Sequence, residues 1–405
     1  MWRASGLSRR SARLSSAAIR VAGRSATHPG PLPPALLPDG IRSRIVSGVG
    51  DLDMHILEAG YEGRGRPAIL LLHGFPELAW CWRRVMPLLA DAGYHVVAPD
   101  QRGFGRTTPQ PDAYLTDLGP YATGNLAADI FHLIDALGLS SVDMLIGHDA
   151  GAIVAGFCAF AQPDRVRRLV LSASPFGGAP PAGALPTTPL LDHPIHEELS
   201  RLSPPRKHYQ AYYCGPEANA DMWHAPQGMH QFLRGYYHQK SADWDGNIPG
   251  PLKGWTGEEI ARLPHYYCMP AQCGMAEVAA AIIPDAGQVA ACTWLSDADL
   301  AVAAAEFDRT GFQPALNWYR SALAEGMTGR DLAPFHGRRL AMPVAFVAGK
   351  ADWGPYQSPR LLESMRDGLA TQPVALHFIE RAGHWVQQEQ PERFAEILLA
   401  FAGPS

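Results

Sequence analysis

The chain has 405 residues, of which 47% are apolar and 18% charged; this excludes extensive disorder and allows a large core in two or three domains, or in one domain with an insertion. The formal net charge is −5, but residues 1–30 carry six Arg and no Asp or Glu, so the rest of the chain holds 28 basic and 39 acidic side chains. Such an acidic body excludes nucleic acid as a partner, because phosphates are neutralised by clustered Lys and Arg.

Residues 1–30 are predicted to form a basic leader outside the fold. They are rich in Arg and Ser, and five arginines would share one helical face: Arg3, Arg10, Arg13, Arg20 and Arg24. This composition is typical of an organelle transit peptide, which would place the protein in the mitochondrion, and equally of a disordered extension on a cytoplasmic protein. Five prolines between residues 29 and 38 then predict a stiff linker, and residues 1–40 as a whole are expected to be disordered.

Several kinds of site and segment are not predicted. No uninterrupted apolar stretch approaches the roughly 20 residues that cross a bilayer as a helix, so no transmembrane segment is expected. The six cysteines contain no CxxC pair and are interpreted as reduced thiols. HPIHEE at 193–198 lacks the HExxH spacing, and no Gly-rich phosphate loop follows a first strand, so neither a metal nor a cofactor is expected.

From about Ile41 the chain alternates β-rich apolar runs with helical patterns. Seven runs are predicted as buried strands: 53–60, 67–74, 95–100, 141–149, 167–174, 343–350 and 374–383. Helices are predicted at 122–137, 151–161 and 391–401. The alternation predicts an α/β fold with a mostly parallel sheet covered by helices.

This alternation stops after Phe176 and resumes only at residue 343. Residues 176–340, which we term the cap segment, are rich in Trp, Tyr, His and Pro and contain short helical patterns. We expect them to form a helical cap over the carboxyl edge of the sheet. Residues 41–175 and 341–405 would then make one catalytic domain around an insertion.

The strand predicted at 141–149 runs into GHDAG at 147–151 and then into a helix. A nucleophile on a sharp strand-to-helix turn has this small-x-nucleophile-x-small pattern, with small residues because the turn leaves no space for other side chains. Asp149 is therefore the predicted nucleophile. Because an Asp at a helix start is also a common N-cap, the interpretation depends on the residues around it.

HGFPE at 73–77 directly follows another predicted strand. In a hydrolase with such a turn, a backbone amide at this place would point at a developing oxyanion. Phe75 and Ala150 are the two predicted N–H donors. The alternative interpretation of HGFPE is an ordinary Gly-Pro loop.

An acid and a base are predicted at the ends of the last two strands. Asp352 follows the strand at 343–350, and His384 follows the strand at 374–383. Open α/β sheets assemble their sites at the carboxyl ends of strands, and the chain order nucleophile, acid, histidine is that of one class of catalytic triad.

With LLHGFPELAWCW, DQRGFGRT, GHDAGA, ALNWYRS and AGHWVQQEQPE, residues 41–405 resemble the epoxide hydrolases of the α/β-hydrolase fold superfamily. The resemblance implies an eight-stranded sheet and the hydrolysis of a small-molecule epoxide by water to a vicinal diol. Asp149 would form an alkyl-enzyme ester. His384, oriented by Asp352, would act as the general base that activates water to hydrolyse this ester.

The resemblance also implies two cap tyrosines that donate to the oxirane oxygen. Tyr319 in ALNWYRS and Tyr209 in KHYQAYY match these donors, with Tyr212 and Tyr213 as close alternatives to Tyr209. A phenol suits this role because its reference pKa of about 10 keeps it protonated at neutral pH.

Further contacts and two departures concern the substrate pocket. The triad's sequence neighbours His148, Trp353 and Trp385 are expected to bind substrate. Ala150 stands where this family commonly has Trp, which would enlarge the site near the leaving oxygen. Residues 264–293 have no recognised counterpart and make the cap segment longer than usual.

Two other functions fit part of the pattern. An aspartate-nucleophile dehalogenase would share the fold and the ester intermediate, but Ala150 stands where its halide-binding indole is expected. A non-catalytic ligand receptor on this fold could lose its water-activating residues without unfolding, whereas Asp149, Asp352 and His384 are all present. Neither the particular epoxide nor the oligomeric state is predicted.

Overall fold

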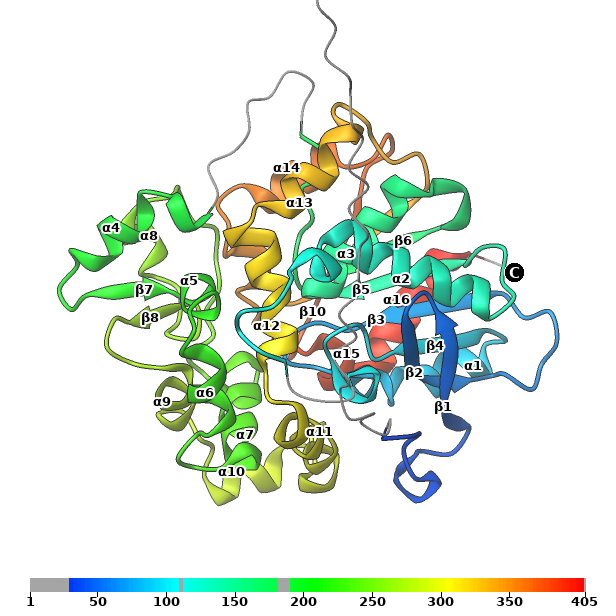
Figure 1. Ribbon diagram of the computed structural model, residues 1–405, viewed down its shortest axis with the longest axis horizontal. Coiled ribbons are helices and arrows are strands. Elements are labelled where there is room, and N and C mark those ends of the chain that lie inside the picture. The colour runs from blue at the N-terminus through cyan, green and yellow to red at the C-terminus, as the bar shows by residue number, and fades with distance from the viewer. Residues whose placement is uncertain (1–28, 109–111, 181–189, 404–405) are drawn as a thin grey trace, which may run out of the picture.

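The computed structural model describes residues 29–108, 112–180 and 190–403 (Figure 1). Its main sheet has eight strands in the order β1-β2-β4-β3-β5-β6-β9-β10. The strands are β1 Ile41–Val49, β2 Leu52–Ala59, β3 Ala68–Leu72, β4 His95–Pro99, β5 Met144–His148, β6 Leu169–Ser172, β9 Val344–Gly349 and β10 Ala375–Ile379. β1 and β2 pair antiparallel, as do β2 and β4, and the other neighbours pair parallel. The predicted α/β-hydrolase fold is confirmed, and β1 is a further strand that its half-buried, partly polar sequence did not reveal.

Helices cover both faces of this sheet. They are α1 Val85–Asp91, α2 Thr123–Ala136, α3 Ala150–Ala161, α14 Leu361–Gly368, α15 Val386–Glu389 and α16 Pro391–Ala402. α2 packs against α3 and β1, whereas α1 packs against α16 and β4. Because β3, β5, β6 and β9 lie between these layers, they are buried along their whole length, as their continuous apolar sequences predict. None of the helices in the described residues combines the length and apolar character of a membrane-spanning segment.

The cap segment leaves and re-enters the sheet between two neighbouring strands, since β6 and β9 pair in parallel. Its elements are α4 Ile195–Ser200, β7 Arg206–His208, α5 Tyr209–Tyr213, α6 Ala218–Trp223, α7 Met229–Lys240, α8 Gly257–Ile260, β8 Cys268–Pro270, α9 Met275–Ala280, α10 Ala286–Ala291, α11 Asp297–Thr310, α12 Gln313–Tyr319, the π-helix η7 Arg320–Ala324 and α13 Met327–Leu332. In Figure 1 the elements from α4 to α10 lie on the left of the view, to one side of the sheet, with the yellow α12 between. β7 and β8 form an antiparallel pair, which a purely helical cap did not predict. The domain boundaries at 175/176 and 340/341 stay a prediction.

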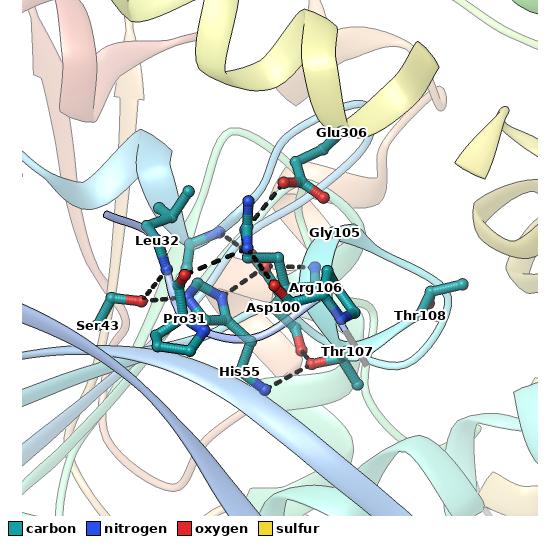
Figure 2. A network of polar contacts seen from close by, with 12 residues as sticks. Pro31, Leu32, Ser43, His55, Asp100, Gly105, Arg106, Thr107, Thr108 and Glu306 are labelled. Atoms are coloured by element: carbon teal, nitrogen blue, oxygen red, sulfur yellow. Dashed lines mark hydrogen bonds and ion pairs between the residues drawn. The ribbon is translucent and has the colours of Figure 1, made fainter. Parts of the chain in front are cut away.

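The expectation that residues 1–40 are disordered is wrong for the linker from residue 29 onward. The Leu32 N–H donates to Ser43 Oγ at 2.7 Å, and the Leu32 side chain is buried. Arg106 donates to the carbonyls of Pro29 and Gly30 at 3.1 and 2.9 Å, while its Nε lies 2.9 Å from the Glu306 carboxylate of α11 (Figure 2). The neighbouring prolines have no N–H that could donate to these two carbonyls. The side chain of Arg106 supplies the donor instead. Residues 1–28 lie outside the described residues, and the transit peptide stays a prediction that the structure does not support.

Candidate active site

Asp149 lies on a strained turn between β5 and α3. Its backbone has φ 51° and ψ −120°, a conformation that a non-glycine residue rarely adopts. A Cβ on Gly147 would lie 2.2 Å from the Gly151 carbonyl oxygen, and a Cβ on Gly151 would lie 2.5 Å from the His73 carbonyl oxygen. Backbone therefore closes the turn on both sides and requires glycine at both positions. Asp149 occupies the N-cap position of α3, but its side chain makes no capping hydrogen bond, so the carboxylate is not engaged by the helix.

The two carboxylate oxygens of Asp149 lie in different environments. Oδ1 accepts the Phe75 N–H at 3.1 Å, whereas Oδ2 accepts the Ser174 hydroxyl at 3.4 Å and lies 3.5 Å from His384 Nε2. Burial by itself would raise the pKa of Asp149, but the contact with His384, followed by the charge of Lys240, holds it well below its usual value. The carboxylate stays ionised, as a nucleophile requires.

His384 is fully buried and is held by a second carboxylate. Its Nδ1 lies 3.1 and 3.3 Å from the two oxygens of Asp352, and Asp352 Oδ1 also accepts the Gly354 N–H at 2.7 Å. The His384 N–H donates to the carbonyl of Lys240 at 2.8 Å. Nε2 faces Asp149, 3.5 Å from Oδ2. The structure thus brings together the three side chains predicted as a triad.

Tyr209 and Tyr319 enter the same cavity from the cap segment. Tyr209 begins α5, Tyr319 ends α12, and their ring centroids lie 6.5 Å apart. The Tyr209 hydroxyl donates to the side-chain oxygen of Gln357 at 2.8 Å. Desolvation, and after it the negative charge of Asp149, raises the pKa of both phenols well above 10, so both remain proton donors.

The alternatives to Tyr209 are committed to other partners. The Tyr212 hydroxyl donates to Asp221 of α6, and the hydroxyl groups of Tyr213 and Tyr236 lie 2.9 Å apart. Neither Tyr212 nor Tyr213 lines the cavity, whereas Tyr209 does. Geometry therefore favours Tyr209 over its neighbours.

The cavity above Asp149 has a volume of about 270 Å³. Its apolar lining includes Leu126, Ala150, Ile153, Val154, Leu323 and Leu361. Gln210, Gln357 and Ser358 supply polar groups elsewhere in the lining. A partly open, mostly apolar cavity with few polar groups fits a small organic molecule.

The expectation that His148, Trp353 and Trp385 bind substrate is wrong, because none of the three lines this cavity. His148 lies one residue before the turn and points the other way, where its Nδ1 lies 2.7 Å from a Glu77 oxygen. The Trp385 indole donates to the carbonyl of Tyr237 at 2.8 Å, and Trp353 is buried. Neighbours in sequence project in different directions from a strand end, so adjacency to a triad residue does not bring a side chain to the substrate.

Two buried acids that support the site were not predicted. Glu77, from the HGFPE motif, pairs with His148, whose pKa is raised because this carboxylate outweighs the effect of burial. Glu389, from QQEQPE, accepts the N–H groups of Gly383 and Trp385 at 2.9 and 3.0 Å, on either side of His384. Both lie in motifs that the sequence displays, but only the tertiary structure reveals what each carboxylate contacts.

Comparison with known proteins identifies chains that are similar in sequence to this one. Residues 67–202 match a family described as alpha/beta hydrolase fold. Epoxide hydrolase A of Mycobacterium tuberculosis is 33% identical over 356 residues, which cover 86% of this chain and 93% of that one. An epoxide hydrolase of Caballeronia sordidicola is 29% identical over 366 residues, covering 89% of this chain and 95% of that one.

Solved structures give the same result. Potato (Solanum tuberosum) epoxide hydrolase I superposes with a TM-score of 0.67 at 29% identity, over 89% of this chain and 98% of that one. Epoxide hydrolase A from Mycobacterium thermoresistibile superposes with a TM-score of 0.64 at 31% identity, over the same shares of the two chains.

Proposed function

Because this chain belongs to the epoxide hydrolases of the α/β-hydrolase fold, we propose that it converts an epoxide to a vicinal diol through an ester on Asp149. The observation that carries this mechanism is the convergence of Asp149 and two protonated tyrosines on one cavity, with His384 Nε2 3.5 Å from Asp149 Oδ2. The partners are a small epoxide and water.

In the first step Asp149 Oδ2 attacks a carbon of the oxirane, and the bond between that carbon and the ring oxygen breaks. Oδ2 is the attacking oxygen because Oδ1 is held by the Phe75 N–H. Tyr209 or Tyr319 gives its proton to the oxygen that leaves the carbon, which yields a hydroxyalkyl ester and a tyrosinate. The apolar wall around Ile153 holds the hydrocarbon part of the substrate.

In the second step water attacks the ester carbonyl carbon, and His384 Nε2 takes its proton. Asp352 orients the ring through Nδ1 and stabilises the imidazolium. The Phe75 N–H, already 3.1 Å from Oδ1, and the Ala150 N–H at the start of α3 stabilise the oxyanion. Collapse of this intermediate breaks the bond between the acyl carbon and Oδ2, and the departing alkoxide takes the proton from the His384 imidazolium, so that the diol leaves. The second proton of the water passes to the tyrosinate, which restores the Asp149 carboxylate and the phenol.

Intact-protein mass spectrometry after mixing with styrene oxide tests the covalent step. The variant His384→Gln should accumulate a species heavier by one epoxide, because the ester forms and cannot be hydrolysed. Asp149→Ala should show no mass increase and no turnover. His336→Gln, on the exposed surface, is the matched control and should behave like the parent.

Absence of the heavier species in His384→Gln would exclude the ester mechanism. A haloalkane panel run beside the epoxides separates the alternative dehalogenase activity, since halide release without diol formation would favour it. Ala150, which supplies no indole to a halide, argues against that outcome.

A further inference from the structure

Lys240, the last residue of α7, is buried next to the catalytic histidine, with 3% of its surface exposed. Its ammonium group lies close to the centroids of four aromatic rings, at 4.9 Å from Tyr267, 5.3 Å from Trp385, 5.6 Å from Tyr236 and 5.8 Å from Tyr266. We term these four rings the aromatic cage. Two of them, Tyr266 and Tyr267, come from the stretch 264–293 that lengthens the cap segment.

The backbone fixes this lysine relative to His384. The Lys240 carbonyl accepts the His384 N–H at 2.8 Å, and a Cβ on Gly383 would lie 2.5 Å from that same carbonyl oxygen. The Trp385 ring, one wall of the cage, lies 4.8 Å from the His384 ring. The backbone of Lys240 is therefore held directly against the loop that carries His384.

The cage holds a positive charge that has no carboxylate in direct contact. Among the described residues the Lys240 ammonium makes cation–π contacts but neither an ion pair nor a hydrogen bond. Desolvation lowers the pKa of Lys240, whereas Asp149, then Asp352 and Glu77, favour its charged form. Aromatic faces attract a cation without neutralising a nearby carboxylate, so Asp149 remains free to attack.

Several ionisable groups face the buried space around Lys240 and His384. They are Asp149, Glu77 and His148 from the sheet edge, Asp352 after β9, Glu389 of α15, Asp243, and the cap tyrosines Tyr236, Tyr266 and Tyr267. Burial raises the pKa of Glu389 to about 8, and the three tyrosines stay neutral because burial raises their pKa values. The negative charges of Asp149, Asp352 and Glu77 are those that favour the charged form of Lys240.

We infer that Lys240 is a positioning residue for ester hydrolysis, whose caged charge balances the buried carboxylates and thereby leaves His384 unprotonated as a base. Without this charge, a proton on His384 would supply the missing positive charge, and the base would be blocked until higher pH. The inference rests on the proposed two-step mechanism.

Single-turnover kinetics with styrene oxide, resolved into alkylation and ester hydrolysis across pH, test the inference in the full chain. In Lys240→Met the pH of half-maximal ester hydrolysis should rise by about one to two units, the effect of one unit charge at close range in a protein interior. At pH values above the new midpoint the rate should return to that of the parent. Lys240→Arg, which keeps the charge, should return the midpoint towards the parent value.

Lys207→Met is the matched control, because the Lys207 ammonium also stands over a ring of the cap segment, 5.1 Å from the Tyr212 centroid, but away from the triad. Its profile should match the parent. If Lys240→Met does not fold by circular dichroism, Lys240→Gln takes its place, since an amide removes the charge and keeps the polarity.

An unshifted midpoint overturns the inference, and so does an equal loss of rate at every pH, which indicates a packing role alone. These outcomes differ from failure of the proposed function. If the proposed function fails, the parent protein itself forms no alkyl-enzyme on mixing. If only the inference about Lys240 fails, the parent forms the ester and the pH profile of the Lys240 variant is unshifted.

Discussion

Asp149 combines backbone strain with an ionised, mostly buried carboxylate, and each feature serves the other. The positive φ projects the side chain out of the turn, where Oδ1 meets the Phe75 N–H and Oδ2 meets His384. A carboxylate withdrawn from water is a stronger nucleophile, provided that nearby positive charge keeps it ionised. At this scale the chemistry depends on which groups stay charged and which stay neutral.

The protonation states of Asp149 and the two tyrosines predict the pH dependence of alkylation. The pKa of Asp149 is lowered, so the nucleophile is lost only when the pH falls below its usual range. The pKa values of Tyr209 and Tyr319 are raised, so the donors are lost only when the pH rises well beyond 10. Alkylation by styrene oxide in stopped-flow should therefore be flat from about pH 5 to pH 10, spanning the ordinary pKa values of these groups.

Removing one of the two tyrosine donors should lower the rate of alkylation without changing its dependence on pH. Tyr319→Phe should slow alkylation by about 10- to 100-fold at every pH, less than the 10²–10⁴ of a whole general acid because Tyr209 remains. The rate of ester hydrolysis should not change. A descending limb below pH 10 in the parent, or unchanged alkylation in Tyr319→Phe, would contradict the role of these phenols.

At the scale of elements, the turn between β5 and α3 packs directly on the end of β3. Gly151 faces the carbonyl oxygens of His73 and Leu72, the residues that lead into the Phe75 amide. One close backbone contact thus joins the turn that carries the proposed nucleophile to the loop that carries the proposed oxyanion donor. Neither side can shift, because both contacts are with backbone and not with flexible side chains.

The variant Gly151→Ala should push the turn between β5 and α3 away from the end of β3. Its Cβ would lie 2.5 and 2.6 Å from the two carbonyl oxygens, so the variant should lose about 1–3 kcal/mol of unfolding free energy, as overpacked cores do. Turnover should fall as well, because the Phe75 amide moves relative to Asp149. Urea unfolding and steady-state rates measure the two effects. Gly254→Ala, with no atom within 4 Å of its Cβ, is the control and should change neither.

At the scale of the whole molecule, one polar network joins the start of the described chain, the sheet edge and the cap segment (Figure 2). Arg106 lies at its centre, between the Pro29 and Gly30 carbonyls and Glu306 of α11. The segment before β1 therefore belongs to the folded body and helps to hold the cap segment against the sheet.

Truncation tests this role of the N-terminal segment. A chain beginning at residue 29 keeps each of these contacts and should be as stable as the full chain. A chain beginning at residue 33 should lose about 1 kcal/mol of unfolding free energy, the lower end of the range for an unpaired polar group, because the Arg106 side chain is only partly buried. Arg106→Met should give a similar loss in the full chain. The same substitution should have a smaller effect in the chain that begins at residue 33, because the truncation and the substitution remove the same interaction. Additive losses in urea unfolding would contradict a shared network.

Much of the catalytic machinery could be predicted from sequence because it lies where strands end. Apolar runs mark β5, β9 and β10, and the polar residues that follow them, Asp149, Asp352 and His384, must meet at one edge of a parallel sheet. The glycines flanking Asp149 added the geometry of the turn. These features depend on residues that are neighbours in the sequence, so the sequence alone can reveal them.

Side-chain direction and long-range partners could not be predicted in this way. His148 follows the same motif as Asp149 but points to Glu77, and Gln357 binds Tyr209 across 148 residues of sequence. Lys240 has no signature in its own surroundings, because its cage is built from three separate parts of the chain.

The sequence by itself thus determined the α/β fold and the three side chains that follow its strands, since hydrophobic periodicity and turn chemistry are local. Only the tertiary structure decided which tyrosine faces Asp149, which neighbours of the triad turn away, and where the buried charges lie. Those outcomes depend on packing between the cap segment and the sheet, and packing is set by contacts between residues far apart in the chain.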